Sequence, residues 1–227
     1  VAAWGFTEVA ERESDTGREL VIRGHAYTEG VAALLWRMKD RVESAVDAKT
    51  LLVKRYVLEQ RENQYHCKTV ITFAPDGRSA DTVKTRYDKP ADDPKRTSQG
   101  TWPCYARLDA ASLAYYLRAF SGAPGQDELT AVFFDGRHSF RIHVIPLAQE
   151  RIRVKAGEFD AYRCEVRFSD IDREPKPGQE SKVQRAVVWV SAGPERLPLK
   201  LESETFVGKV FGELAGRWAP EPEPGGS

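Results

Sequence analysis

Alternation of apolar and polar residues is the dominant pattern along this chain. In residues 149–156 cationic side chains alternate with Ile152 and Val154, and similar runs occupy residues 162–168 and 199–207. Because successive side chains of a β-strand point to opposite faces, each run predicts a strand with one buried face and one face in water. Half-buried strands of this kind are typical of antiparallel sheets.

Short turn sequences separate many of the predicted strands. Asp135-Gly136 lies between the runs 129–134 and 137–145, and Pro75-Asp76-Gly77 lies between two further runs. Glycine and aspartate accept the positive φ angles of tight turns, so both sites predict antiparallel hairpins. About 11–12 strands, joined mainly by hairpins, are expected along the chain.

The predicted fold class is mainly β with minor α. So many strands do not suit one flat open sheet, and we expect a curved antiparallel sheet or incomplete β-barrel with short helices across its opening. Residues 1–218 are expected to form one domain. The tail 219–227 is rich in proline, glycine and glutamate and is expected to be disordered.

Two segments depart from the alternation and predict short amphipathic helices. Asp109 is a suitable N-cap for a helix that ends near Gly122, and a shorter helix is expected over residues 30–37. A barrel of about a dozen strands leaves interior space, so the helices either close a cavity or complete a filled core. The apolar positions of these helices are the candidate cavity-lining residues: Leu34, Leu35, Leu113, Tyr116, Leu117 and Phe120.

Two polar segments are interpreted as surface loops. Residues 89–100 are rich in proline, aspartate and lysine, and residues 174–181 are also polar. The first loop is a candidate contact surface for a partner protein.

The charge balance argues against one class of function. Lys+Arg and Asp+Glu each number 34, and the two signs interleave along the chain. A protein that binds nucleic acid is expected to gather a basic excess on one surface. No stretch approaches the ~20 apolar residues that span a bilayer, so no transmembrane segment is expected. The chain starts at Val1, and any signal peptide is expected to lie outside it.

Cysteine usage leaves two alternatives open. Cys67, Cys104 and Cys164 can form one disulfide and one free thiol, or three buried thiols that behave as small apolar residues. We favour the absence of a disulfide. Cys104 lies just before the predicted helix at Asp109, where a thiol could have a lowered pKa and act as a nucleophile. A buried thiol beside aromatic residues is the favoured interpretation.

Motifs for metal binding and catalysis are missing from the sequence. The four histidines are scattered, and neither HExxH nor CxxC spacing occurs. A GxSxG nucleophile motif and a phosphate-binding loop are also absent. We therefore expect no metal, no cofactor and no enzymatic activity, with a Cys104-based enzyme as the alternative.

Several short motifs occur in a fixed order along the chain. They are the segment 43–47, D-x-x-S-x-x-Y-x-L-R from Asp109 to Arg118, AGxF at 156–159, W-x-S…R-x-P-x-x-x-E from Trp189 to Glu202, and a final hairpin at 206–210. Together they resemble the exported bacterial domain-of-unknown-function 3108 family over almost the whole chain.

This resemblance implies a fold similar to the lipoprotein localisation factors (LolA/LolB-like): an incomplete antiparallel barrel, helices across its opening and an apolar interior. It also implies export to the periplasm, with association to the outer membrane left open. The family has no established catalytic residues, so none are transferred to this chain.

The predicted function is a non-catalytic envelope protein that binds a lipid or another hydrophobic ligand between sheet and helices. The alternative is an envelope interaction or assembly module with a filled core and no small ligand. The sequence does not identify the ligand, the protein partner or the oligomeric state.

Overall fold

The computed structural model describes residues 3–15, 17–88, 93–105, 108–116, 118, 123–125, 128–171, 185–205 and 208–217. Thirteen strands and two short helices are assigned within these residues. All described strand pairings are antiparallel, and the strands form two sheets that do not close into a barrel within the described ranges. The mainly β prediction is confirmed, and the number of strands is slightly higher than predicted.

The chain divides into two compact units. The first consists of residues 1–117, 131–141 and 170–181, and the second of residues 118–130, 142–169 and 182–227. Each unit is described by itself below. The single domain over residues 1–218 stays a prediction, and the tail 219–227 lies outside the described residues.

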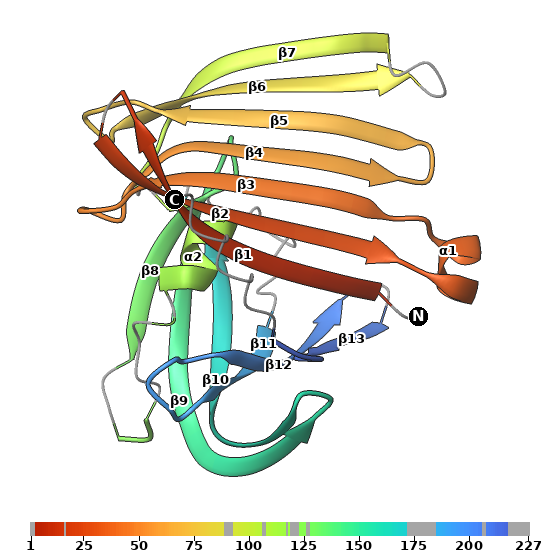
Figure 1. Ribbon diagram of the computed structural model, residues 1–227. Coiled ribbons are helices and arrows are strands. Elements are labelled where there is room, and N and C mark those ends of the chain that lie inside the picture. The colour runs from red at the N-terminus through yellow and green to blue at the C-terminus, as the bar shows by residue number, and fades with distance from the viewer. Residues whose placement is uncertain are drawn as a thin grey trace, which may run out of the picture. The chain divides into compact units, whose positions relative to one another are not determined.

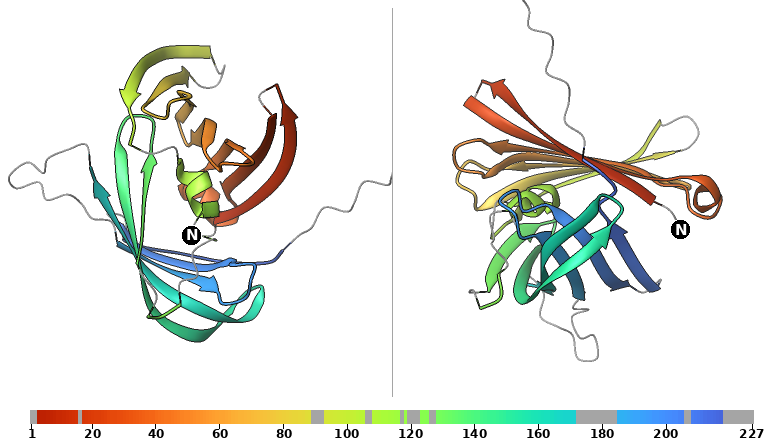
Figure 2. Two further views of the ribbon diagram at one scale, coloured as in Figure 1. Left: turned by 90° about the vertical axis from the view of Figure 1, so that its left-hand side faces the viewer. Right: turned by 60° about the horizontal axis from the view of Figure 1, so that its bottom comes forward.

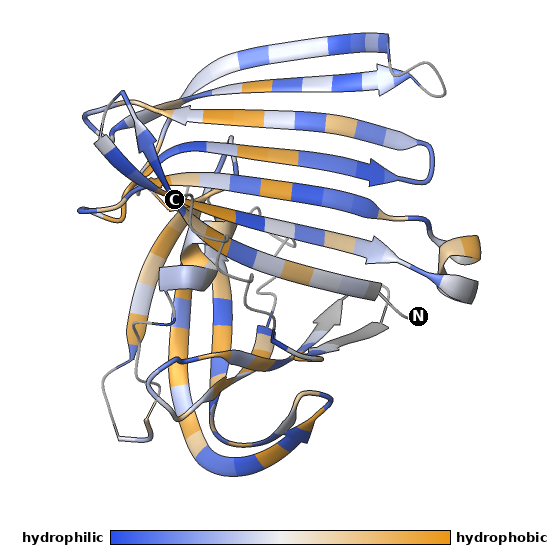
Figure 3. Cartoon of the chain, in the orientation of Figure 1, coloured by the Kyte–Doolittle hydropathy of each residue, from blue (hydrophilic) through white to orange (hydrophobic). Residues whose placement is uncertain are grey.

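The first unit contains a seven-stranded sheet in which every strand pairs with its neighbours in sequence (Figure 1). Residues of opposite hydropathy alternate along several of these strands, as the sequence pattern predicts (Figure 3). The strands are β1 (Ala3–Ser14), β2 (Gly17–Thr28), β3 (Lys39–Asp47), β4 (Val53–Glu62), β5 (Tyr65–Phe73), β6 (Ser79–Asp88) and β7 (Asp93–Pro103).

The predicted glycine turns occur where the hairpins need them. Gly77 has a φ of 71° in the β5–β6 turn, and Gly136 has a φ of 102° in the turn between β8 (Leu129–Phe134) and β9 (Ser139–Val154). Residues with a Cβ rarely adopt such angles. The hairpins predicted at both turns are therefore confirmed.

The interpretation of residues 89–100 as a long surface loop is wrong. Residues 93–103 form β7, which pairs with β6 from Ser79–Pro103 to Asp88–Asp93, while residues 89–92 lie outside the described residues. β7 is an edge strand, and most of its side chains are exposed on both faces. A strand without a buried face needs no apolar alternation, so its polar composition resembles that of a loop. The second predicted loop, 174–181, is outside the described residues.

The described residues contain two short helices, and each belongs to the first unit. Helix α1 (Gly30–Leu35) connects β2 to β3, and helix α2 (Ala110–Tyr116) follows β7. Helix α2 packs against β2 and β3 and lies on the concave side of the seven-stranded sheet (Figure 2). The predicted continuation of this helix beyond Tyr116 falls largely outside the described residues.

The core of the first unit lies on the sheet face that carries α2. We call this face, on which Ile22, Ser44, Tyr56 and Ile71 align across four strands, the inner face, and the opposite one the outer face. The buried core residues are Ile22, Val46, Val53, Tyr56, Ile71, Phe73, Ala80, Cys104 and Phe134.

The second sheet has the strand order β13-β12-β11-β10-β9-β8. Its remaining strands are β10 (Gly157–Asp170), β11 (Arg185–Ser191), β12 (Pro198–Thr205) and β13 (Gly208–Glu213). Strand β9 is continuous, whereas the sequence pattern predicts two shorter strands at 137–145 and 149–156. The core of the second unit consists of Val154, Ala161, Trp189 and Leu199.

Candidate functional site

A buried polar cluster fixes the start of α2 on the inner face. Asp109 is fully buried, and its Oδ1 accepts hydrogen bonds from the backbone N–H groups of Ala111 and Ser112, both at 2.8 Å. The Ser112 hydroxyl in turn accepts the Asp109 N–H at 2.9 Å. This is a capping box with serine in the third helical position, and it confirms Asp109 as the N-cap.

The second oxygen of Asp109 joins the helix to the sheet. Asp109 Oδ2 accepts a hydrogen bond from the Ser44 hydroxyl of β3 at 2.5 Å. Burial raises the pKa of Asp109, although its hydrogen bonds act in the opposite direction. Burial is also the main reason that the pKa of Tyr56 is raised, with a further contribution from the Asp109 charge. The D-x-x-S motif and the segment 43–47 therefore meet in one structural cluster.

A shallow apolar depression lies beside this cluster. The space inside it is about 10 Å³, which is room for about one water molecule and far below the roughly 300–1,000 Å³ of typical small-molecule pockets. The buried side chains Ile22 and Val46 contribute to its lining. The lining residues, which we call the α2 groove, are Ile22, Val46, Leu51, Ser112, Tyr115 and Tyr116.

Leu51 is the conformational exception in the α2 groove. It lies in the β3–β4 turn with a φ of 58°, a left-handed conformation that costs a residue with a Cβ roughly 1–2 kcal/mol. Its side chain is nevertheless 39% exposed. Asp47 closes the same turn by accepting hydrogen bonds from the Thr50 N–H, the Thr50 hydroxyl and the Lys49 N–H. These bonds lower the pKa of Asp47 to about 2.

The structure brings together part of the predicted set of lining residues. Tyr116 lines the α2 groove and is 38% exposed, whereas Leu113, on the same helix, is buried. Leu34 lies on α1, at another part of the sheet (Figure 1), and is 82% exposed. The Leu35 side chain, Leu117 and Phe120 lie outside the described residues.

Five groove residues were not predicted as lining residues from the sequence, and one of them, Ser112, entered only through the D-x-x-S motif. Ile22 and Val46 belong to predicted strands, but alternation alone does not show which strand a helix will cover. Tyr115 was passed over because the helical spacing was counted from Leu113. Leu51 lies in a turn that is closed by hydrogen bonds to Asp47, and apolar alternation does not reveal such a position.

The candidate nucleophile is part of the core. Cys104 is buried in the core of the first unit, and its Sγ donates a hydrogen bond to the Gly77 carbonyl at 3.5 Å. None of the three cysteines, all of which are described and buried, forms a disulfide, and burial raises the pKa of Cys164 to about 11. A reactive thiol is normally accessible and has a lowered pKa. The described contacts of Cys104 are those of a packing residue.

Two further absences hold for the described part of the chain. His, Cys, Asp and Glu side chains do not gather there in a group of three or more that could hold a metal ion. None of the described helices is both long and apolar enough to cross a membrane.

A second group of motif residues orders the β11–β12 connection in the second unit. The Ser191 hydroxyl accepts the Leu197 N–H at 2.9 Å. Arg118 donates two hydrogen bonds to the Glu195 carbonyl, and Arg196 lies over the Tyr162 ring.

The tryptophan of the same motif is held by another strand of the same sheet. The Trp189 indole N–H donates to Glu150 of β9 at 2.6 Å. These contacts give the W-x-S…R-x-P motif a structural role.

The fold and the groove define the class of protein: a β protein of two open antiparallel sheets, with a short capped helix on one of them. The sequence matches the family described as "Protein of unknown function (DUF3108)" over residues 2–215, and the chain belongs to this family. No curated protein matches it. A similar solved structure is the beta-barrel-like protein of domain of unknown function DUF1849 from Brucella abortus. Its TM-score is 0.45 at 8% identity, with 94% of this chain and 95% of that chain covered.

Proposed function

We propose that this chain is a non-catalytic, exported envelope protein that binds an acyl chain or another hydrophobic ligand at the α2 groove. The observation that carries the proposal is the conformation of Leu51. Its apolar side chain lines the groove and is exposed, while its backbone has an unfavourable positive φ angle. Backbone strain of this kind concentrates at ligand sites, because the surrounding structure must maintain it against its cost. Export to the periplasm is part of the proposal and follows from the family resemblance.

The size of the α2 groove sets the expected affinity. Burying about six methylene groups would contribute about 5 kcal/mol, at roughly 0.8 kcal/mol each. Association costs at least about 4 kcal/mol of lost translational and rotational freedom. These figures leave a net free energy of only about −1 kcal/mol, which is a Kd on the order of 0.1 M for one short chain segment. Millimolar binding therefore requires the ligand to bury about four further methylene groups on the exposed side chains around the groove. Weak binding suits the transient holding of a ligand.

A fluorescent fatty-acid titration of the full chain tests the proposal. We expect saturable binding that is lost in Tyr116→Glu, because a carboxylate on the groove wall opposes burial of an alkyl chain. Tyr105→Glu is the matched control, since Tyr105 is also exposed but does not line the α2 groove. The absence of saturable binding to the wild type, or an equal loss in both variants, would refute the ligand site.

The second candidate function is an envelope interaction module with a filled core. β7 favours it, because β7 is an exposed edge strand and edge strands can accept a strand from a partner. Capture of a defined envelope protein that is lost in Thr97→Lys/Gln99→Lys but retained in Tyr116→Glu would support this candidate. Loss of ligand in Tyr116→Glu without any such capture would support the groove.

A further inference from the structure

Large apolar side chains are exposed at the α1 end of the first unit. Leu34 is 82% exposed and Trp36, directly after α1, is 48% exposed. Trp4 and Phe6 of β1 are exposed as well, and the Phe6 ring stacks on His25 with the centroids 4.4 Å apart. α1 projects beyond the ends of β2 and β3 in the view of Figure 1. Such a group of exposed apolar residues marks an interaction surface.

Backbone hydrogen bonds fix the segment that carries Trp36. The Thr28 hydroxyl donates to the Trp36 carbonyl at 2.7 Å and accepts the Met38 N–H at 3.0 Å. The Arg37 N–H donates to the Asn63 side-chain oxygen at 2.8 Å, and the Asn63 N–H donates to the Arg37 carbonyl. The backbone around Trp36 is therefore hydrogen-bonded on both sides, although the Trp36 ring itself is not buried.

Exposed cations follow these apolar residues at alternate positions. Lys39 is directly cross-strand from Tyr27, and Arg41 from His25, on the outer face. Arg37, Lys39 and Arg41 are exposed. None of the three forms an ion pair with another described residue, whereas Arg23 pairs with both Glu8 and Glu43.

The nearest carboxylates do not pair with these cations within the described residues. Glu59 is cross-strand from Arg41 on the outer face, but its carboxylate accepts a hydrogen bond from Arg61. The Asp40 carboxylate lies on the inner face and accepts the Arg61 N–H. Glu29, just before α1, adds one exposed negative charge to the segment. The arrangement is therefore an apolar tip of Leu34 and Trp36 followed by three cations available for an external anion.

We propose that this tip docks on an anionic lipid bilayer, with Leu34 and Trp36 entering the headgroup region and Lys39 and Arg41 meeting the lipid phosphates. Tryptophan is enriched at the membrane–water interface, where its ring is partly apolar and its N–H stays hydrated. Basic residues beside such a tip gain from the negative surface potential of the bilayer. The charge complementarity selects an anionic membrane over a neutral one. The docking surface does not use the α2 groove, so this proposal and the proposed ligand site can fail independently.

Co-sedimentation of the full chain with vesicles tests the docking. Wild type should bind vesicles that contain phosphatidylglycerol more tightly than vesicles of phosphatidylcholine alone, and added salt should weaken the binding. Lys39→Gln/Arg41→Gln should reduce the partition coefficient by roughly 25-fold, at about fivefold for each cation. Leu34→Gln/Trp36→Gln should reduce it by about tenfold or more.

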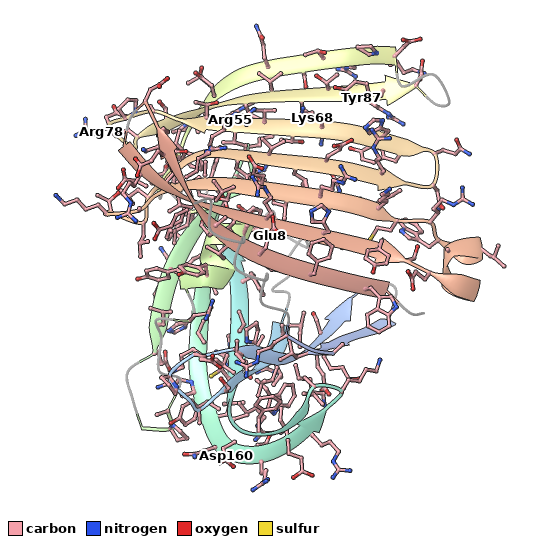
Figure 4. The ribbon with its side chains drawn as sticks, viewed as in Figure 1. Glu8, Arg55, Lys68, Arg78, Tyr87 and Asp160 are labelled. Carbon is pink, nitrogen blue, oxygen red and sulfur yellow. The ribbon has the colours of Figure 1, made fainter. Side chains whose placement is uncertain are left out.

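Matched variants at other sites test whether the loss of vesicle binding is specific to this surface or follows from any loss of charge or apolar area. Arg55→Gln/Arg78→Gln removes the same charge on β4 and in the β5–β6 turn, away from α1 (Figure 4). Tyr105→Gln/Leu147→Gln removes two other exposed apolar side chains. Both controls should keep at least half of the wild-type partition coefficient. No preference of the wild type for anionic vesicles, or equal losses in the controls, would overturn the proposal. A tip that binds a protein instead of lipid would give the first of these results.

Discussion

The two helices of the first unit are nearly equal in length and carry similar apolar spacing, yet they have opposite environments. Leu113 of α2 is 7% exposed, whereas Leu34 of α1 is 82% exposed. The difference lies in what surrounds each helix. α2 begins at a buried N-cap that is bonded to β3, while α1 begins at Gly30, with a φ of 59°, in the connection between β2 and β3. A short amphipathic pattern therefore predicts a helix but does not show whether the helix covers a core.

The largest expected effect comes from removing the cap of α2. Asp109→Ala removes the acceptor of the Ser112 N–H and the Ser44 hydroxyl in buried surroundings, and of the Ala111 N–H in partly buried ones. A lost N-cap costs about 1 kcal/mol, and buried groups left without partners cost about 1–3 kcal/mol more. The free energy of unfolding should fall by about 3 kcal/mol in urea titrations.

Two matched variants sharpen this prediction. Asp109→Asn keeps one side-chain oxygen for the backbone N–H groups and should lose roughly 1 kcal/mol less than Asp109→Ala. Glu29→Ala, directly before α1, should change stability by less than about 0.5 kcal/mol. A loss of similar size at Glu29 and Asp109 would remove the contrast between the two helices.

Truncation of one leucine in each helix gives the next largest difference. Leu113→Ala creates a cavity beside the inner face and should cost about 2–3 kcal/mol. Leu34→Ala should stay within about 0.5 kcal/mol, because its side chain is already in water. Chemical denaturation of both variants, with the m-value checked for two-state behaviour, measures the difference. Near-equal losses would mean that α1 contributes to a core in solution.

The contrast also explains how much of the structure the sequence could predict. Hairpins such as the one at Gly77 and the cap at Asp109 depend on neighbouring residues, and local patterns carry that information. β7 was missed because an edge strand with both faces in water lacks the alternation that identifies other strands. The bond between Ser44 and Asp109 joins residues 65 positions apart. Only the strand pairing, which places β3 beneath α2, brings these two residues together.

The residues of the candidate site also divide into those that local sequence patterns predict and those that depend on the tertiary structure. Tyr116 was predicted from helical spacing, and it lines the α2 groove. Leu34 has the same kind of signal, but it lies in α1, which does not contribute to that groove. Leu51 could not be predicted, because its exposure depends on a turn that is closed by hydrogen bonds to Asp47.

A substitution at Leu51 should separate stability from ligand binding. Asparagine tolerates a positive φ better than leucine does, so Leu51→Asn should raise the free energy of unfolding by up to about 1 kcal/mol. The same change removes an apolar wall of the α2 groove and should weaken fatty-acid binding severalfold. Thermal unfolding and the fatty-acid titration measure the two effects on one sample. A variant that loses stability while binding normally would contradict the role assigned to Leu51.

The smallest expected effect concerns the pH dependence of the turn that holds Leu51. The folded pKa of Asp47 is lowered to about 2 from an ordinary value of 3.8 by hydrogen bonds from the Thr50 N–H and hydroxyl, among others. Its contribution to stability is therefore fully present above pH 3.8 and is lost as the pH falls through about 2. Asp47→Asn should flatten this part of the profile of urea midpoint against pH.

A second variant weakens the same hydrogen bonds without removing the carboxylate. Thr50→Ala removes the hydroxyl donor but keeps the N–H donor, and should give an intermediate slope. An unchanged acid profile in both variants would show that these hydrogen bonds persist in the unfolded chain or do not form in solution. The positive φ angle of Leu51 would then have to be maintained by contacts other than the hydrogen bonds to Asp47.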